Sequence, residues 1–572
     1  MNLSKTRRLV PLFVLLALVI ALAAVIGPAA AANKPPVTVQ ILAVNDFHGN
    51  LVPPTGSGGR VQTSPIGVLP VTTVDAGGVE YLATHLKALE ATNPRTVIVS
   101  AGDMIGATPL LSALFHDEPT IEAFNKMGLD FNAVGNHEFD EGTKELLRMQ
   151  KGGCHPVDGC QDGDGFQGAA FQYLAANVVS EKNGKTLFPA YKVRNFNGVK
   201  VAFIGMTLEG TPDIVSPSGV AGYDFLDEAD TVNALVPKLQ RQGVQAIVVL
   251  VHEGGFPTGI YNECPGISGP IVDIVNRTSD EVDLFITGHT HMAYNCVIDG
   301  RPVTSAFSNG RIVTDVDMEL DRGSGDVLSI TVNNVIVTRT VTPDAFMTNL
   351  IAEYNAVAAP LANRVIGSIT ADILRANNTS GESALGDVIA DGQLDATDDP
   401  GFGDAVVAFM NPGGIRADLL FNQISGGEQP GEVTYGEMFT VQPFGNSLVT
   451  MTLTGAQLET VLEQQFAGCG GGTTNRILQV SEGFSYSWSA SAPACSKVDP
   501  STIMIDGVVV NPAATYRVTV NSFLADGGDS FPVLREGTDR LGGAVDTDAF
   551  EAYFVANSPV PPGPQNRITQ VP

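Results

Sequence analysis

Short apolar runs alternate with amphipathic helical patterns in the first part of the chain. Six runs have the length and composition of buried strands that end in a polar loop: "VTVQILAVND", "TVIVSAGD", "FNAVGN", "VAFIGMT", "AIVVLVHE" and "DLFITGH". Helical patterns lie between several of them, for example "GVEYLATHLKALEATN" and "EADTVNALVPKLQRQG". Strands that alternate with helices predict a layered α/β domain over residues 37–340.

The pattern changes beyond this region. The stretch "TPDAFMTNLIAEYNAVAAPLANRVIG" has helical periodicity after a Thr-Pro start. It predicts a linker helix over residues 341–365, with an ordinary surface helix as the alternative. Residues 366–572 mix helical and strand patterns with many glycine turns, and they predict a second domain of the α+β type.

The first residues have the pattern of an export signal. Lys5, Arg7 and Arg8 precede an apolar run over residues 9–26, and the small residues of "GPAAAAN" follow. This order predicts a signal peptide over residues 1–32 that is removed after cleavage. A retained membrane anchor is the alternative, because the run approaches the length of a membrane span.

The composition indicates which kinds of binding partner are disfavoured and in which cellular compartment the chain folds. Asp and Glu outnumber Lys and Arg by 61 to 32, which gives a net charge of −29. Such a field disfavours nucleic-acid polymers and anionic membranes as partners. Six cysteines without CxxC spacing are typical of disulfides in an oxidising compartment. Proximity in the sequence favours the pairs Cys154–Cys160, Cys264–Cys296 and Cys469–Cys495.

Five strand ends carry side chains that bind metals, and loops at the carboxyl ends of strands meet at one edge of an α/β sheet. The candidates are Asp46 and His48 in "AVNDFHGN", Asp103 in "SAGDMIGATP", Asn136, His137 and Asp140 in "AVGNHEFDEG", His252 in "VLVHEGG", and His289 and His291 in "ITGHTH". Each alone has an ordinary explanation as a turn, a cap or a structural histidine. Together, imidazoles and carboxylates favour a pair of divalent ions such as Zn or Mn. His85, His116 and His155 lie outside this pattern and receive no role.

The motifs resemble those of a known family. "NDFHGN", "GD", "GNHEFD" and "GHTH" resemble the calcineurin-like metallophosphoesterase motifs, and "NPGGIR", "QPFGNSL" and "FLADGGDSF" resemble the C-terminal domain of the 5′-nucleotidase family. That family includes periplasmic UDP-sugar hydrolases and ecto-5′-nucleotidases. The resemblance covers nearly all of the mature chain. It implies a four-layer α/β/β/α sandwich followed by an α+β substrate-binding domain.

The resemblance also implies the roles of the strand-end residues. It assigns one metal to Asp46, His48, Asp103 and His291, and the other to Asp103, Asn136, His252 and His289, with Asp103 bridging. His137 would stabilise charge or protonate the leaving oxygen, and Asp140 would orient it. Some relatives have Gln at the position of His291, so metal preference can differ here.

Substrate recognition is assigned by resemblance to the second domain. Arg416 has the planar, always charged guanidinium that suits phosphate. Phe444 and Phe523 would hold a base between two aromatic faces. The further expected contacts are Asn411, Asn446 and Asp529 to the nucleoside, and Arg375 to phosphate. The sequence departs from the family at Asp387, where Gly-Asn is usual.

The resemblance predicts an exported phosphohydrolase that acts on nucleoside 5′-monophosphates, with other nucleotides as further candidates. The alternatives are a UDP-sugar or dinucleotide pyrophosphatase, a 2′,3′-cyclic nucleotide phosphodiesterase, or a catalytically inactive nucleotide-binding protein. The expected location is secreted, periplasmic or at the cell surface, without stable membrane insertion once the signal is removed. The oligomeric state is left open.

Overall fold

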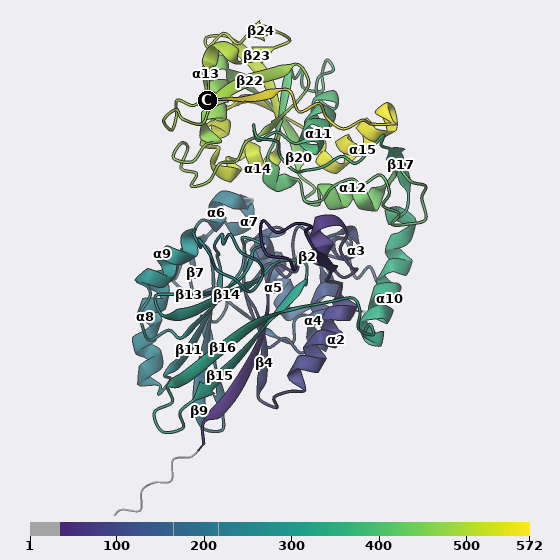
Figure 1. The fold of residues 1–572 in the computed structure, drawn as a ribbon. Helices are drawn as coiled ribbons and strands as arrows, with labels where there is room; N and C mark the ends of the chain where they lie inside the picture. The colour runs from purple at the N-terminus through teal and green to yellow at the C-terminus, as the bar shows by residue number, and fades with distance from the viewer. Residues whose placement is uncertain (1–34, 164, 216) are drawn as a thin grey trace, which may run out of the picture.

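The computed structural model describes residues 35–163, 165–215 and 217–572 (Figure 1). The predicted signal peptide, residues 1–32, lies outside the described residues. Figure 1 shows two bodies, one N-terminal and one C-terminal, joined along one side by the helix α10 (Ala345–Ala362). Among the described residues, no helix is long and apolar enough to cross a membrane.

The N-terminal body contains two six-stranded sheets. The order of the first sheet is β16 (Val327–Ile336), β15 (Ile312–Leu320), β1 (Val37–Val44), β4 (Thr96–Ser100), β5 (Phe131–Ala133) and β6 (Gln172–Leu174). The order of the second is β13 (Ala293–Ile298), β14 (Arg301–Ala306), β12 (Leu284–Thr287), β11 (Ala246–His252), β9 (Val199–Thr207) and β8 (Tyr191–Phe196). Strands β1, β4, β5 and β6 are mutually parallel, as are β9, β11 and β12. Two small ribbons accompany them: β2 (Arg60–Gln62) with β3 (Thr73–Asp75), and β7 (Val178–Ser180) with β10 (Tyr223–Phe225).

Both faces of each sheet are buried, which explains the nearly continuous apolar strands. In β1, Ile41 packs between the two sheets, while its neighbour Leu42 packs toward the helices. In β11, Val248 faces the other sheet and Val249 faces outward to helices. Because side chains alternate along a strand, a strand that is covered on both sides needs apolar residues at every position.

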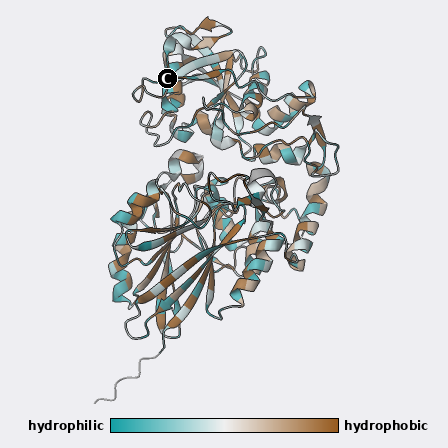
Figure 2. Cartoon of the chain, in the orientation of Figure 1, coloured by the Kyte–Doolittle hydropathy of each residue, from teal (hydrophilic) through white to brown (hydrophobic). Residues whose placement is uncertain are grey.

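Helices cover the two outer faces and complete four layers. Helices α2 (Val79–Glu90), α4 (Glu118–Met127) and α5 (Gly142–Lys151) lie on the first sheet, and α8 (Glu228–Arg241) and α9 (Pro270–Arg277) lie on the second. Figure 2 shows apolar strands inside the sandwich and helices of mixed hydropathy outside. The short helices α3 (Leu110–Ala113), α6 (Thr211–Ile214) and α7 (Pro217–Val220) lie in connections. The predicted α/β/β/α sandwich is therefore confirmed.

Helix α10 packs on the N-terminal body. Its first turn is capped by the Asp344 carboxylate, which accepts hydrogen bonds from the backbone N–H groups of Phe346 and Met347. Met347 and Tyr354 insert into the core formed with α2 and α4. The chain therefore leaves the sandwich along a helix that is anchored to its surface.

The C-terminal body is built on a mixed five-stranded sheet of order β21 (Gln479–Val480), β18 (Val407–Met410), β25 (Thr515–Asn521), β20 (Ser447–Thr454) and β26 (Thr538–Val545). Helices α11 (Ala384–Asp395) and α15 (Asp546–Asn557) pack over one core, and α13 (Gly455–Gln464) packs over another. A second sheet has the order β24 (Val508–Val509), β23 (Met504–Ile505), β22 (Phe484–Ser489) and β27 (Ile568–Val571). The remaining elements include β17 (Val365–Ser368), β19 (Glu432–Thr434), α12 (Tyr435–Val441) and α14 (Ser522–Ala525). This arrangement confirms the predicted α+β type.

The cysteines form three disulfides in the predicted pairing. The bonds are Cys154–Cys160, Cys264–Cys296 and Cys469–Cys495. The first closes a short surface loop after α5, the second joins the chain before α9 to β13, and the third lies in the C-terminal body.

Candidate metal centre

The candidate ligands meet at one edge of the sandwich. Strands β1, β4 and β5 of the first sheet and β11 and β12 of the second end at this edge, which faces the C-terminal body (Figure 1). The backbone φ angles of Asp46, His48, Asp103, His289 and His291 all lie between 47° and 68°. Such left-handed conformations are uncommon outside glycine and concentrate at functional sites.

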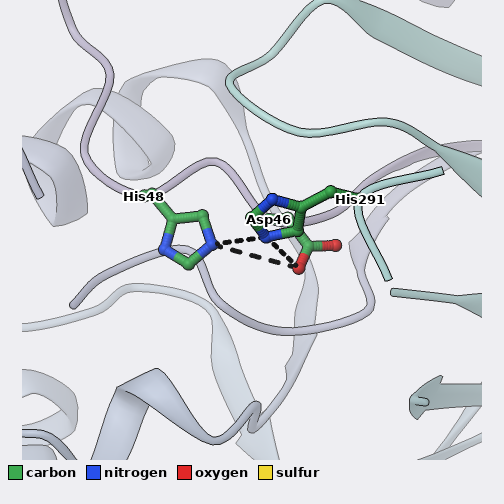
Figure 3. A group of neighbouring side chains, drawn as sticks. All are labelled: Asp46, His48 and His291. Carbon is green, nitrogen blue, oxygen red and sulfur yellow. Dashed lines mark hydrogen bonds and ion pairs between the residues drawn. The ribbon is translucent and has the colours of Figure 1, made fainter. Parts of the chain in front are cut away.

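One group contains Asp46, His48 and His291, from the loops after β1 and β12 (Figure 3). His291 Nε2 lies 3.3 Å from Asp46 Oδ1 and 3.0 Å from His48 Nε2. Asp46 and His48 are buried, and the His291 side chain is 35% exposed. The group is thus buried at Asp46 and His48 and reaches solvent at His291.

A second group contains Asp103, His252 and His289. His252 Nε2 lies 2.9 Å from Asp103 Oδ2, which is also 3.8 Å from His48 Nε2 of the first group. Asn136 Oδ1 lies 3.1 Å from His252 Nε2 and 3.0 Å from His289 Nδ1. Asp103 therefore stands between the two groups.

Backbone carbonyls fix two of the imidazoles from behind. His48 Nδ1 donates to the carbonyl oxygen of Gly106 at 2.8 Å, and His252 Nδ1 donates to that of Ala101 at 2.7 Å. Because a carbonyl can only accept, each Nδ1 carries a proton. Burial holds the pKa of His48 well below its usual value, so Nε2 of His48 is left with a lone pair that faces the centre. Several lone pairs then converge with two carboxylates, and this nitrogen and oxygen donor set fits divalent ions of the Zn or Mn kind.

The electrostatics of the centre favour the metal-binding protonation state at Asp103 and at His289. At His252, burial acts to lower the pKa, but Asp103 outweighs it and raises that pKa to about 10, so a bound ion would have to displace a proton there. Burial acts to raise the pKa of Asp103, but the neighbouring His252 and His137 outweigh it and hold that pKa well below its usual range. Burial lowers the pKa of His289 to about 3, and the charge on His252 adds to this effect. An ionised carboxylate and a neutral imidazole are the forms that bind metals.

His137 stands beside the two groups without belonging to either. Its Nδ1 lies 2.9 Å from Asp140 Oδ2, and its backbone N–H donates to Asp103 Oδ1 at 2.8 Å. Burial acts to lower the pKa of His137, but the carboxylates of Asp140 and Asp103 raise it overall. The Asp140 carboxylate therefore holds the His137 imidazole through Nδ1.

Glu138 is a supporting residue that the motif pattern did not single out. Its carboxylate accepts hydrogen bonds from the backbone N–H groups of Asp103, Met104 and Gly135 and from the side chain of Asn132. It therefore ties the β4 and β5 loops together underneath the centre. In the sequence, only its position next to His137 indicated a role for Glu138. Without the tertiary contacts, a buried Glu that accepts backbone hydrogen bonds cannot be distinguished from a solvated one.

Two residues of the C-terminal body reach toward this edge. The Phe444 ring lies 5.8 Å from the His137 ring at 23°, and the Arg416 guanidinium lies 5.8 Å from the Phe444 ring. Burial lowers the pKa of Arg416, as does the nearby Arg375, while Asp103 and Asp140 act in the opposite direction. Arg416 and Phe444 therefore lie across from the metal groups.

The other candidates lie deeper in the C-terminal body and bond to one another. Asn411 donates from Nδ2 to Asp529 Oδ2 at 2.8 Å and accepts from Asn521 Nδ2 at 2.9 Å. Arg476 Nε lies 3.4 Å from Asp529 Oδ1. The sequence did not point to Asn521 or Arg476. Asn521 caps the N-terminus of α14 and Arg476 lies in a loop, and neither position belongs to a recognisable motif.

The remaining three candidates flank this network. Asn446 Oδ1 accepts from Ser522 Oγ at 3.3 Å, and the Phe523 ring packs on Gly528, where an added Cβ would come within 2.4 Å of it. Arg375 is exposed and lines a cavity of about 330 Å³ with Pro412, Ile415 and Asp418, at the foot of the loop that carries Arg416. Phe444 and Phe523 thus have different neighbours: Phe444 lies against His137 of the N-terminal body, and Phe523 packs within the C-terminal body.

Two groups of metal-binding side chains at one edge of an α/β/β/α sandwich define a metal-dependent phosphoesterase. The model of the calcineurin-like phosphoesterase family matches residues 39–293, and that of the 5′-nucleotidase C-terminal domain matches residues 365–536. Cell wall protein Lmo0130 of Listeria monocytogenes is 32% identical over 92% of this chain and 68% of its own length. The chain belongs to the 5′-nucleotidase family, and these matches indicate a metal-dependent hydrolase.

Two further similarities extend over nearly the whole chain. Endonuclease YhcR of Bacillus subtilis is 32% identical over 90% of this chain, which spans 39% of the length of that protein. The crystal structure of a 5′-nucleotidase precursor from Thermus thermophilus is 27% identical, with a TM-score of 0.73 over 93% of this chain and 99% of its own. The arrangement of both bodies is therefore shared with a solved protein.

Proposed function

We propose that this chain is an exported phosphohydrolase that uses two divalent ions to release phosphate from nucleoside 5′-monophosphates. One observation carries the proposal: Arg416 and Phe444 of the C-terminal body lie across from the metal groups, with Phe444 5.8 Å from His137. A guanidinium suits a phosphate, and an aromatic face suits a base. A site for simple phosphate esters would not need the aromatic partner.

The ligand sets follow the two groups of side chains. Asp46, His48 and His291 would hold one ion; Asn136, His252 and His289 would hold the other, and Asp103 would contact both. When bound, the ions supply Lewis-acid polarisation of the phosphoryl group and activation of water. Both are of the Zn or Mn kind, because the donors are imidazole and carboxylate without thiolate.

The side chains around the ions would position the substrate and handle the proton. Arg416 would hold the phosphate oxygens with its guanidinium. His137, whose Nδ1–H is held by Asp140, would donate a proton from Nε2 to the leaving 5′ oxygen. Asp140 would keep the imidazole in this orientation during the step.

The nucleoside would be bound by the C-terminal body. Phe444 and Phe523 would contact the base, and the carboxylate of Asp529 would accept hydrogen bonds from ribose hydroxyls. Asn411 would hold the Asp529 carboxylate, and Asn446 would hold Ser522, which precedes Phe523. Arg375 would add positive charge beside Arg416. Residues 366–572 would thus form a substrate-binding domain, and 341–365 would link it to the sandwich of residues 37–340.

Export is supported by the three disulfides, which persist in oxidising compartments. The signal peptide proposed over residues 1–32 would direct the chain there. The relative named an endonuclease raises the question of polymer substrates, but a net charge of −29 opposes binding of a polyanion.

A substrate panel tests the proposal. AMP, UMP, UDP-glucose, NAD, 2′,3′-cyclic AMP and single- and double-stranded DNA are assayed for hydrolysis with Zn, Mn and Mg. AMP and UMP should give the highest kcat/KM and should yield inorganic phosphate. A higher kcat/KM for UDP-glucose, NAD or the cyclic ester would show that nucleoside monophosphates are not the preferred substrates. Cleavage of DNA would show that the chain also accepts nucleic-acid polymers. Binding of adenosine without hydrolysis of any compound would reject the enzyme.

A further inference from the structure

A second cluster of histidines and carboxylates lies apart from the catalytic edge. His116 occupies the corner between α3 and α4, and Glu141 directly precedes α5. His155 and Asp158 lie on the loop after α5 that the Cys154–Cys160 disulfide closes. Three segments of the chain therefore bring metal-binding side chains to one place on the surface.

The side chains converge at short distances. Asp158 Oδ2 lies 3.0 Å from His116 Nε2 and 3.1 Å from His155 Nδ1. The two imidazole rings stack with their centroids 3.7 Å apart and their planes at 21°. One oxygen and two nitrogens thus lie within 4.8 Å of one another.

Hydrogen bonds indicate which nitrogens carry lone pairs. The backbone N–H of Asp158 donates to His155 Nδ1 at 3.2 Å, so this nitrogen is unprotonated, and a bound ion would replace that hydrogen bond at its lone pair. Glu141 Oε2 lies 2.8 Å from His116 Nδ1, and a carboxylate there holds the proton on Nδ1 and leaves Nε2 as the ligand atom. A carboxylate behind a histidine is the usual support of a zinc ligand.

Glu145 is the other carboxylate near His116, but it is engaged elsewhere. Both of its oxygens bond to the guanidinium of Arg148, at 2.6 to 2.9 Å. The free set is therefore His116, His155 and Asp158. The side chains of His116 and His155 are 17% and 15% exposed, and that of Asp158 is 45% exposed, so a fourth position is open to water.

We propose that His116, His155 and Asp158 bind a further divalent ion, of the zinc class, with Glu141 orienting His116. Two imidazoles, one carboxylate and one water make a four-coordinate set that zinc accepts. The competing occupant is a proton. The hydrogen bond that His116 donates to Glu141 raises the pKa of His116 to about 9, so in the absence of the ion an imidazolium bridges Glu141 and Asp158.

The site adjoins the supports of the catalytic edge. Asp117, next to His116, accepts from the backbone N–H of Gly106, whose carbonyl fixes His48. Glu141 follows Asp140, which orients His137. An ion here would tie the disulfide loop to both supports, so it should stabilise the fold without contacting substrate.

The test is the number of zinc ions per chain, measured by elemental analysis after equilibrium dialysis of the wild type and of His155→Gln and Asp158→Asn. Each variant should hold one ion fewer than the wild type. His85→Gln is the matched control, because His85 bonds only to the carbonyl of Thr338 and should keep the wild-type number. Because the result is a difference, it does not depend on how many ions the catalytic centre holds.

A thermal scan gives an independent reading. Added zinc should raise the Tm of the wild type more than that of either variant, because an ion that binds the folded state stabilises it by mass action. Circular dichroism of the apo proteins verifies that Asp158→Asn, the milder change, folds. Equal zinc content and equal Tm shifts in the wild type and Asp158→Asn would show that the cluster holds only a proton, and would overturn the proposal.

Discussion

The N-terminal edge and the C-terminal pocket arrange their polar side chains in opposite ways. At the edge, lone pairs face one another, and His48 Nε2 lies 3.0 Å from His291 Nε2. In the pocket, Asn411 is satisfied by Asp529 and Asn521 on both sides. At the edge, the facing ring nitrogens and carboxylates need bound cations to balance them. In the pocket, the polar side chains already have hydrogen-bond partners in one another. We therefore expect substitutions at the edge to remove catalysis and those in the pocket to alter nucleotide binding.

The largest effect is expected at the residue that joins the two metal groups. Asp103→Asn should lower kcat by at least about 10⁴-fold, which corresponds to about 5.4 kcal/mol of barrier. A neutral amide in place of the bridging carboxylate should also reduce bound metal, measured by elemental analysis. The half-buried Asp321, on the turn between β15 and β16, offers Asp321→Asn as the control, with metal and activity retained. Full metal content in Asp103→Asn would place the ions elsewhere.

His137→Ala separates catalysis from metal binding at the same edge. It should reduce kcat by about 10³-fold, within the usual range for a lost general acid, because His137 is the imidazole that Asp140 holds. Metal content should stay at the wild-type value, since His137 belongs to neither metal group. Loss of an ion from this variant would instead make His137 a ligand.

Phe444→Ala tests the aromatic residue that spans the two bodies. It should lower kcat/KM for AMP by about 30-fold, because stacking on a base contributes roughly 1–3 kcal/mol. Hydrolysis of p-nitrophenyl phosphate, which has no base, should change by less than about threefold on the same reasoning. Phe256→Ala, at an exposed phenylalanine outside the proposed pocket, is the control. Equal losses on both substrates would mean that Phe444 supports His137 and does not contact a base.

The smallest effect is expected inside the self-satisfied network. Arg476→Gln removes the ion pair to Asp529 but leaves its hydrogen bond from Asn411, so KM for AMP should rise by about threefold to tenfold while kcat is nearly unchanged, as expected when one weak polar contact is lost. Steady-state kinetics gives both values. A fall in kcat with a constant KM would contradict the division of labour between the edge and the pocket.

The strands, the layers and the positions of the polar loops were predictable because burial leaves a local signature. Runs such as "AIVVLV", which precedes His252, are apolar at every position, since β11 is covered on both faces. Proximity in the sequence also selected the disulfides, because all three close short separations. Arg476 and the His116 cluster were not found, and for Glu138 the sequence left a supporting and a solvated position open, because the roles of these residues depend on partners that are distant in the sequence.

The sequence by itself determined that metal-binding side chains follow five buried strands and that guanidinium and aromatic residues occupy loops of a second body. Their spacing along the chain does not decide how they group: the family resemblance implied a division, and the tertiary structure shows which side chains lie together. His289 and His291 are separated by one residue, yet His291 lies with Asp46 and His48 while His289 lies with Asp103 and His252. His116 and His155, 39 positions apart, stack at 3.7 Å. Distances along the chain do not set distances in space, because strand pairing and loop closure bring remote segments together.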